Sequence, residues 1–229
     1  MNNEINSVSV VMSVYNSEKT LSKSIESILN QTYKQFEFLI MDDGSTDNTG
    51  AILEKYALDD KRIKVHKNKK NIGLTKSLNI LISKSKGIYI VRQDADDISK
   101  KERIKKQLDY IVHENLDAST TRAKIIGENR VIPRFSHLLP KKILIRYKNP
   151  YIHGSLIIKK SILKEHNYYD EKFYYSQDYK LMSDLVKSKG RIGIIKEPLY
   201  YLNMKNNIST NYYKEQQYYA QCVKLGIEP

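Results

Sequence analysis

Residues 88–97 read IYIVRQDADD, an apolar run that ends in three carboxylates within four positions. The β-branched and aromatic residues predict a buried strand, which places Asp94, Asp96 and Asp97 at its carboxyl end. Carboxylates this close repel one another unless a hard cation lies among their oxygens. The stretch therefore predicts a Mg²⁺ or Mn²⁺ site that also holds phosphate groups.

The segments before this run alternate between strand and helix patterns. Apolar runs predict strands at 8–14, 36–41 and 63–66, and apolar residues at helical spacing predict helices around 21–29, 52–57 and 74–82. Strands that alternate with helices form a mostly parallel central sheet flanked by helices. Ligands of such α/β folds bind beyond the carboxyl ends of the strands, where the acidic run lies.

Ser99 and Glu102, which follow the acidic run, have the spacing of a capping box. The helix that would follow has a predicted apolar stripe of Ile104, Leu108, Ile111 and Val112. After about residue 115 the alternation of strand and helix patterns becomes less regular. Later runs predict a strand at 156–158, a helix at 181–186, a strand at 192–195 and a terminal helix at 212–224. No linker or repeat divides the chain, so we expect one α/β domain.

The composition is that of an ordinary globular protein, with 40% hydrophobic and 28% charged residues among 229. The polar first residues show no secretory signal, and no apolar run reaches the roughly 18 residues that span a bilayer. The single cysteine, Cys222, excludes an internal disulfide and fits a reducing compartment. We therefore expect a cytoplasmic protein.

The formal net charge of +13 is large for this length. One interpretation is a set of solvated lysine faces that keep the protein dispersed. The functional interpretations are anionic nucleotide substrates, an anionic membrane surface, or nucleic acid. The 18 tyrosines would suit base stacking or a membrane interface. No RNA- or DNA-binding signature is present, so we expect no nucleic-acid partner.

Two further polar clusters carry candidate chemistry. Asp42 and Asp43 follow a predicted strand and precede Gly44, so their carboxylates could accept the imide N–H of a uracil or a ribose hydroxyl. The alternative is an Asx-rich turn that caps the next helix. Asp178 precedes an amphipathic helix, where it could be a helix N-cap or a general base facing the metal site. The residues alone leave both alternatives open.

An ordered series of motifs resembles the family 2 glycosyltransferases, which have the GT-A nucleotide-diphospho-sugar transferase fold. Each motif is weak alone, but their order and spacing from Val8 to Ser209 are specific. In chain order the motifs are SVYN at 13–16, QTY at 31–33, DDGSTD at 42–47, NIGL at 71–74 with Asn79, DADDIS at 94–99 with Arg103 and Gln107, NPYIHGS at 149–155, and QDY at 177–179.

The resemblance implies roles for individual residues. Asp178 matches the catalytic base of inverting members, and Asp97 is left a structural role. Asp94 and Asp96 match the DxD element that holds Mn²⁺ or Mg²⁺, with Asp96 as the direct ligand. The positions implied to bind the nucleotide sugar are Ser13, Tyr15, Asp42, Asp43, Asp94, Ala95 and Asp96, and those implied to line the donor and acceptor region are His153 and Gln177. A structural histidine is the alternative for His153.

The implied activity is metal-dependent inverting transfer of a sugar from a nucleotide-diphosphate donor to a glycan or glycolipid hydroxyl. The expected donor is a UDP-sugar. Family members often carry Arg and His near the leaving diphosphate, where this chain has Leu202 and Met204, and Lys205 is a possible substitute. A lectin-like or scaffold protein on the same fold is therefore an alternative. A sugar nucleotidyltransferase is disfavoured because residues 15–18, YNSE, lack the glycine-rich basic loop that holds a triphosphate.

The same resemblance divides the single GT-A domain into a nucleotide-binding half, residues 1–114, and a smaller acceptor and catalytic half, residues 115–209. A C-terminal helix is expected within residues 210–229, which are rich in tyrosine and lysine. Such a helix suits peripheral contact with the anionic inner face of a membrane, where a lipid-linked acceptor would lie.

Overall fold

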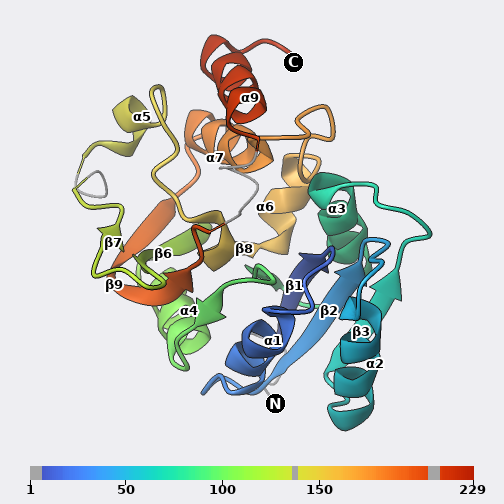
Figure 1. Ribbon diagram of the computed structural model, residues 1–229. Coiled ribbons are helices and arrows are strands. Elements are labelled where there is room, and N and C mark those ends of the chain that lie inside the picture. The colour runs from blue at the N-terminus through green and yellow to red at the C-terminus, as the bar shows by residue number, and fades with distance from the viewer. Residues whose placement is uncertain (1–6, 136–138, 206–211) are drawn as a thin grey trace.

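The computed structural model describes residues 7–135, 139–205 and 212–229 (Figure 1). Its strands form one sheet in the order β3-β2-β1-β4-β8-β6-β9-β5, and β7 pairs with β6. The strands are β1 (Val8–Val14), β2 (Phe36–Asp42), β3 (Ile63–Lys67), β4 (Tyr89–Arg92), β5 (Ile98–Ser99), β6 (Ala118–Ile125), β7 (Val131–Ile132), β8 (Ile157–Lys159) and β9 (Ile192–Leu202). The predicted α/β class is confirmed, and the sheet runs without interruption through both halves of the chain.

The first four strands are parallel and end at one edge of the sheet. Val14 pairs with Asp42, Asp42 pairs with Lys67, and Val11 pairs with Arg92. The loops after β1, β2 and β4 therefore leave the sheet side by side, as parallel topology requires. The antiparallel pairing of β8 with β4 then extends the sheet into the second half of the chain.

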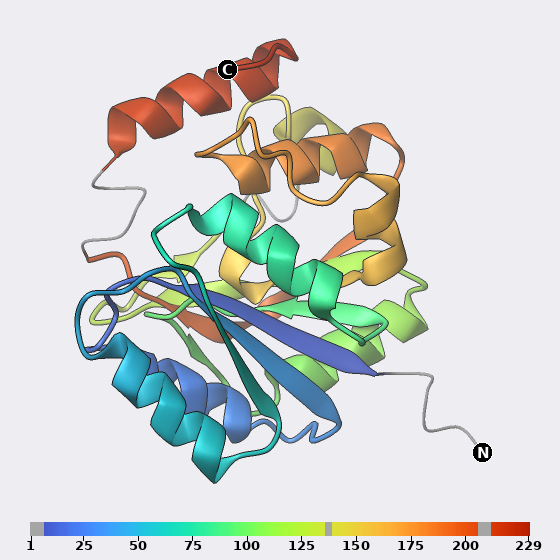
Figure 2. The same ribbon diagram turned by 90° about the vertical axis from the view of Figure 1, so that its right-hand side faces the viewer.

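Helices cover both faces of the sheet (Figure 2). The helices of described residues are α1 (Leu21–Leu29), α2 (Thr49–Asp59), α3 (Leu74–Lys84), α4 (Arg103–His113), α5 (Lys141–Leu144), α6 (Lys160–Glu165), α7 (Gln177–Lys187) and α9 (Tyr213–Leu225), with the 3-10 turn η2 (His153–Ser155). None of them is long and apolar enough to cross a membrane.

The side-chain period of two sorts the strand residues between two cores. Val10 and Met12 face α1, α2 and α4, whereas Val11 between them faces α3, α6 and α7. Phe38 and Leu39 divide in the same way. Because both faces are buried, these strands read as continuous apolar runs in the sequence.

Two sequence predictions next to the acidic run are wrong. Ser99 is not an N-cap, because it lies in β5 and pairs with Tyr200 of β9, and its hydroxyl donates to Gln93 Oε1. The helix begins at Arg103 after an N-cap residue, Glu102, that makes no side-chain cap bond. Val112 is 59% exposed and does not belong to the buried stripe of α4. The sequence predicted that the last strand ends at residue 195, but β9 continues to Leu202. Its additional residues Tyr200 and Tyr201 pair with residues 98–99, which therefore belong to the sheet.

Candidate active site

The acidic loop after β4 folds into a tight turn, in which the Asp97 N–H donates to the Asp94 carbonyl at 3.3 Å. Asp96 is partly exposed, and Asn203 Nδ2 donates to its Oδ2 at 3.2 Å. Asp97 is buried and accepts the backbone N–H of Asn203 at 2.7 Å. The end of β9 therefore closes over the loop and binds two of its three carboxylates.

The carboxylates of this loop repel one another. Burial raises the pKa of Asp96 to about 6, and the charge of Asp94 adds to the rise. Burial also raises the pKa of Asp97 well above its ordinary value, with further contributions from Asp94 and Asp96. Negative charge at this place is therefore in excess, and a bound cation would relieve it.

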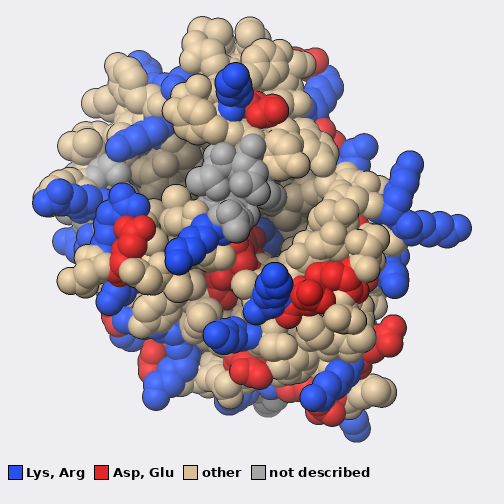
Figure 3. All heavy atoms as spheres, viewed as in Figure 1, with Lys and Arg blue, Asp and Glu red and all other residues tan. Residues whose placement is uncertain are grey.

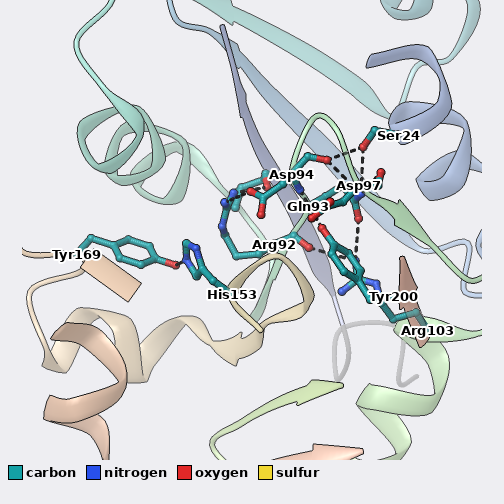
Figure 4. A network of polar contacts seen from close by, with 10 residues as sticks. Ser24, Arg92, Gln93, Asp94, Asp97, Arg103, His153, Tyr169 and Tyr200 are labelled. Atoms are coloured by element: carbon teal, nitrogen blue, oxygen red, sulfur yellow. Dashed lines mark hydrogen bonds and ion pairs between the residues drawn. The ribbon is translucent and has the colours of Figure 1, made fainter. Parts of the chain in front are cut away.

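Arg92, at the end of β4, fixes the first carboxylate of the loop (Figure 4). Its side chain is fully buried, and its Nη2 donates to Asp94 Oδ1 at 2.5 Å while its Nη1 donates to the Val11 carbonyl at 3.2 Å. A Cβ at Gly154 would lie 2.5 Å from Asp94 Oδ2. Only glycine therefore allows η2 to approach the loop this closely.

A buried polar cluster beneath the loop holds it rigid. Gln93 Nε2 donates to Ser24 Oγ on α1 and to the Asp97 carbonyl, while Arg103 Nε donates to Ser99 Oγ. The Arg103 guanidinium also lies over the ring of Tyr200. Burial lowers the pKa of Arg103 to about 10, so this group stays charged at neutral pH. These bonds tie the loop to α1, α4 and β9.

The residues predicted to bind the nucleotide lie at the neighbouring strand ends. Ser13 is in β1 opposite Met41 of β2, and Tyr15, just after β1, is 47% exposed. Asp42 Oδ1 accepts the Ser45 N–H at 2.9 Å, while its buried Oδ2 accepts no hydrogen bond from the described residues. That oxygen lies 3.9 Å from Lys67 Nζ, so Tyr15 offers an open ring face, whereas the Asp42 carboxylate is buried and paired with a lysine.

Asp43 is engaged differently from Asp42. Its Oδ1 accepts Asn68 Nδ2 and the Ile72 N–H, and its Oδ2 accepts the Gly73 N–H at 2.9 Å. The side chain is buried and anchors the loop between β3 and α3. Direct contact of Asp43 with a nucleotide stays a prediction.

Asp178 lies in the first turn of α7 and is not its N-cap. The N-cap position belongs to Ser176, which has a positive φ of 54° and a hydroxyl that donates to Gln216. Asn149 Nδ2 donates to Asp178 Oδ2 at 2.8 Å. Burial raises the pKa of Asp178, and Asp94 adds to this shift. The predicted base and the DxD element are therefore close enough to interact electrostatically.

His153 is bonded rather than free. Its Nε2 lies 2.7 Å from the hydroxyl of buried Tyr169, and the two rings meet edge to face. Burial, and then the charge of Arg92, holds the pKa of His153 well below its usual range. The ring is thus neutral at neutral pH in the protein without ligand. Gln177 is the first residue of α7 and is buried.

Leu202 and Met204, which stand where family members often carry Arg and His, lie at the end of β9 and just after it. Leu202 ends β9 opposite Ile125, and Met204 is partly buried. Lys205 is exposed, and its N–H donates to Asn203 Oδ1. Residues 206–209 of the same motif lie outside the described residues.

The donor set fits a small hard cation. Asp94 and Asp96 supply carboxylate oxygens, and among the described residues no group of three His, Cys, Asp or Glu side chains gathers as a complete cage. Mg²⁺ is typically held by one or two carboxylates, with substrate phosphates and water completing its shell. The excess negative charge and the small number of protein ligands both agree with this arrangement.

Comparison with known sequences identifies the family. A sequence model described as glycosyl transferase family 2 matches residues 9–182. The chain belongs to this family. The match contains the three candidate elements, Tyr15 to Asp43, Asp94 to Asp96, and Asp178.

Two relatives show the family over most of the chain. An uncharacterized glycosyltransferase of Haemophilus influenzae is 33% identical over 227 residues, which cover 92% of this chain and 69% of the relative. The Escherichia coli protein named UDP-Glc:alpha-D-GlcNAc-diphosphoundecaprenol beta-1,3-glucosyltransferase WfgD is 30% identical over 216 residues, covering 91% of this chain and 81% of its own length.

A solved transferase structure superposes on this one. The mannosyltransferase PcManGT from Pyrobaculum calidifontis, solved in complex with GDP-Man and Mn²⁺, gives a TM-score of 0.77 at 16% identity. The superposition covers 97% of this chain and 65% of the mannosyltransferase chain. The GT-A fold predicted from the family motifs is therefore confirmed.

Several residues of the site had no assigned role in the sequence. Arg92, Asn149, Tyr169, Tyr200 and Asn203 all contact predicted site residues. Asn149 opens the NPYIHGS motif, and Arg92 also left a signal, because a cation at the end of an apolar strand is unusual unless it is paired. The others come from distant segments, so only the fold brings them to the site.

Proposed function

We propose that this protein catalyses metal-dependent, inverting transfer of a sugar from a nucleotide-diphosphate donor, with UDP as the nucleotide, to a hydroxyl of a glycan or glycolipid. The observation that carries the proposal is that Asp94, in the loop that also contains Asp96, lies near enough to Asp178 on α7 for its charge to raise the pKa of Asp178. Such transfer needs charge stabilisation at the leaving diphosphate and a base for the acceptor. Asp94 and Asp96 would hold the cation that stabilises the leaving diphosphate, and Asp178 would be the base.

Asp96 and Asp94 are the residues that would hold Mn²⁺ or Mg²⁺. The bound ion would supply positive charge to the leaving nucleotide diphosphate. Arg92 orients Asp94 through the 2.5 Å ion pair, and Asn203 orients Asp96. Preorganised charges of this kind need no rearrangement as the reaction proceeds, which is why they lower barriers effectively.

Asp178 would accept the proton of the acceptor hydroxyl. The hydroxyl oxygen forms its bond to the anomeric carbon while the bond to the diphosphate oxygen breaks on the opposite face, which inverts the configuration. Asn149 holds Asp178 through the 2.8 Å hydrogen bond. The pKa of Asp178, raised by burial, makes its carboxylate a stronger base than a solvated aspartate.

The nucleotide would bind at the ends of β1 and β2. The exposed ring of Tyr15 offers a stacking face, and Asp42 Oδ2, which accepts no hydrogen bond from the described residues and lies 3.9 Å from Lys67 Nζ, would accept from a base or ribose donor. The name of the Escherichia coli relative WfgD supports UDP, whereas the mannosyltransferase neighbour binds GDP-Man. The donor nucleotide is therefore the first property to test.

A thermal-shift screen with nucleotide sugars and Mn²⁺ tests the donor assignment. We expect a UDP-sugar at about 100 times its Kd to stabilise the protein by about 2.7 kcal/mol, because it binds only the folded state. The GDP-sugars, under the same conditions, serve as the control. Equal or larger shifts with GDP-sugars would overturn the UDP assignment, and no shift with any donor would count against donor binding.

The same assay, followed by measurement of donor hydrolysis, separates an enzyme from its non-enzymatic alternative. We expect slow release of UDP in the presence of Mn²⁺, since water can replace the acceptor. A lectin-like or scaffold protein on this fold would release none, with or without added acceptors. The neutral His153 and the absence of Arg and His at Leu202 and Met204 are the observations that favour this second candidate.

The pH profile tests the role of Asn149. Because Asp178 must be ionised to accept a proton, activity should fall as the pH drops through its raised pKa. Asn149→Ala removes a hydrogen bond that lowers this pKa, so the acid limb of kcat should move to higher pH. A hydrogen bond to a charged group is worth about 1.5–3 kcal/mol, so its loss should move the acid limb measurably. An unmoved limb would show that Asp178 is not the titrating base.

A further inference from the structure

A hollow between three elements of the second half lies away from the acidic loop. It has a volume of about 270 Å³, and α5, α7 and α9 all contribute to its lining. Its floor contains the buried side chains of Ile145, Val186 and Val223. These three elements meet in the upper part of Figure 1, on the side of the molecule opposite α2.

The rim of this hollow is basic. Five exposed cations line it, namely Lys142, Arg146, Lys187, Lys189 and Lys224, and the lining contains no acidic residue. Within the described parts of the chain, no ion pair involves any of the five. Their charges therefore add to one another instead of being compensated.

Apolar side chains project beside these cations. Ile143 and Tyr147, on and just after α5, are 59% and 69% exposed, and Leu225 at the end of α9 is 62% exposed. Ile143 follows Lys142 directly, and Leu225 follows Lys224 directly. Exposed aliphatic and tyrosine side chains among lysines are typical of a surface that lies at a membrane interface. Figure 3 shows Lys and Arg side chains at the upper left, near α5, whereas carboxylates occur at the left, centre and right of this face and beside α9 at the top.

We propose that this α5–α9 surface, defined by the five rim cations with Ile143, Tyr147 and Leu225, docks on a bilayer that contains anionic phospholipid. The cations would lie at the phosphate level, and the apolar side chains would enter the headgroup boundary. Each Lys or Arg near an anionic membrane strengthens binding about fivefold. Five uncompensated cations are thus sufficient for binding at moderate salt, although a single cation is not.

Other occupants fit the surface less well. A second copy of the chain would bring the same five cations together, which is unfavourable. Nucleic acid would match the charge but would leave Ile143 and Leu225 in contact with a polar backbone. A bilayer matches both the cations and the apolar side chains.

Docking here would place the active site close to the membrane. Helix α7 carries Asp178 near its beginning and Lys187 at its end, a separation of about 14 Å at 1.5 Å per residue. A glycolipid acceptor with its head group at the bilayer surface would then lie within reach of Asp178. This consequence rests on the proposed function, whereas the binding itself does not.

Sedimentation with vesicles tests the proposal on the whole chain. We expect binding to vesicles of phosphatidylcholine with phosphatidylglycerol, weaker binding as salt rises, and none to phosphatidylcholine alone. The double variant Lys142→Glu, Arg146→Glu should bind at least about 25-fold more weakly. The double variant Ile143→Ser, Leu225→Ser should also weaken binding, by about tenfold or more.

The matched control is Lys55→Glu, Lys61→Glu, which makes the same charge change on and beside α2, where both residues are exposed. It should bind vesicles nearly as the unmodified protein does. Equal loss in this control, or unchanged binding in the α5 charge variant, would overturn the proposal. So would tighter binding to a DNA duplex than to anionic vesicles. An unchanged thermal midpoint in all variants shows that each one is folded, and this readout does not depend on the proposed function.

Discussion

Replacement of Asp178 by Asn is expected to lower kcat for sugar transfer by about 10²–10⁴-fold, the usual contribution of a general base. Asn keeps the shape of the side chain and an oxygen that can accept from Asn149, but it cannot take a proton. Nucleotide binding should change little, because the proposed nucleotide site is at the ends of β1 and β2. Steady-state transfer and UDP-dependent thermal protection measure the two effects separately.

The fold should tolerate this replacement. The folded-state pKa of Asp178 is raised, so its ionised form opposes folding as the pH rises through that pKa. Asn removes this cost, and the thermal midpoint at pH 7 should stay level or rise. The control is Asp184→Asn on the same helix, which removes only a partly exposed ion pair with Lys180 and should leave kcat unchanged. Loss of UDP protection in Asp178→Asn would refute the base assignment.

Local patterns were sufficient to predict the four parallel strands β1 to β4, but not β6, which lies between β8 and β9. Val10, Val11 and Met12 are all apolar because β1 is buried on both faces, and this continuous run is what the sequence displays. The parallel order then follows from the intervening helices. The β5–β9 pairing could not be predicted, because it joins residues about 100 positions apart and overrides the capping pattern at Ser99.

The candidate site also contains residues that the local sequence predicts and residues that only the fold brings together. Asp94 and Asp96 were found from the sequence because their chemistry is local, with several like charges at one strand end. Their partners Asn203 and Tyr200 come from β9 and its end, and no local pattern distinguishes them. The protonation state of His153 could not be predicted from the sequence either, because its lowered pKa results from burial and from the nearby charge of Arg92.

Asp96→Ala should abolish the metal dependence of nucleotide binding. In the unmodified protein we expect Mn²⁺ to strengthen UDP binding, since the ion would offset both the diphosphate charge and the excess negative charge of the loop. Without Asp96 the remaining ligand is Asp94, whose charge is already paired with Arg92 at 2.5 Å. Calorimetric titration of UDP with and without Mn²⁺ should then give the same Kd, and transfer should fall by at least about 10²-fold.

The variant should stay folded, because the carboxylate that it removes carries an unfavourable charge. Burial and the neighbouring Asp94 raise the pKa of Asp96 to about 6, so above that pH its charge opposes folding. Loss of the 3.2 Å hydrogen bond from Asn203 lowers the free energy of unfolding, but only by a modest amount. Asp109→Ala, which removes an exposed carboxylate of α4 paired with Lys105, is the control and should retain the Mn²⁺ effect. An Asp96→Ala protein in which Mn²⁺ still strengthens UDP binding would place the metal elsewhere.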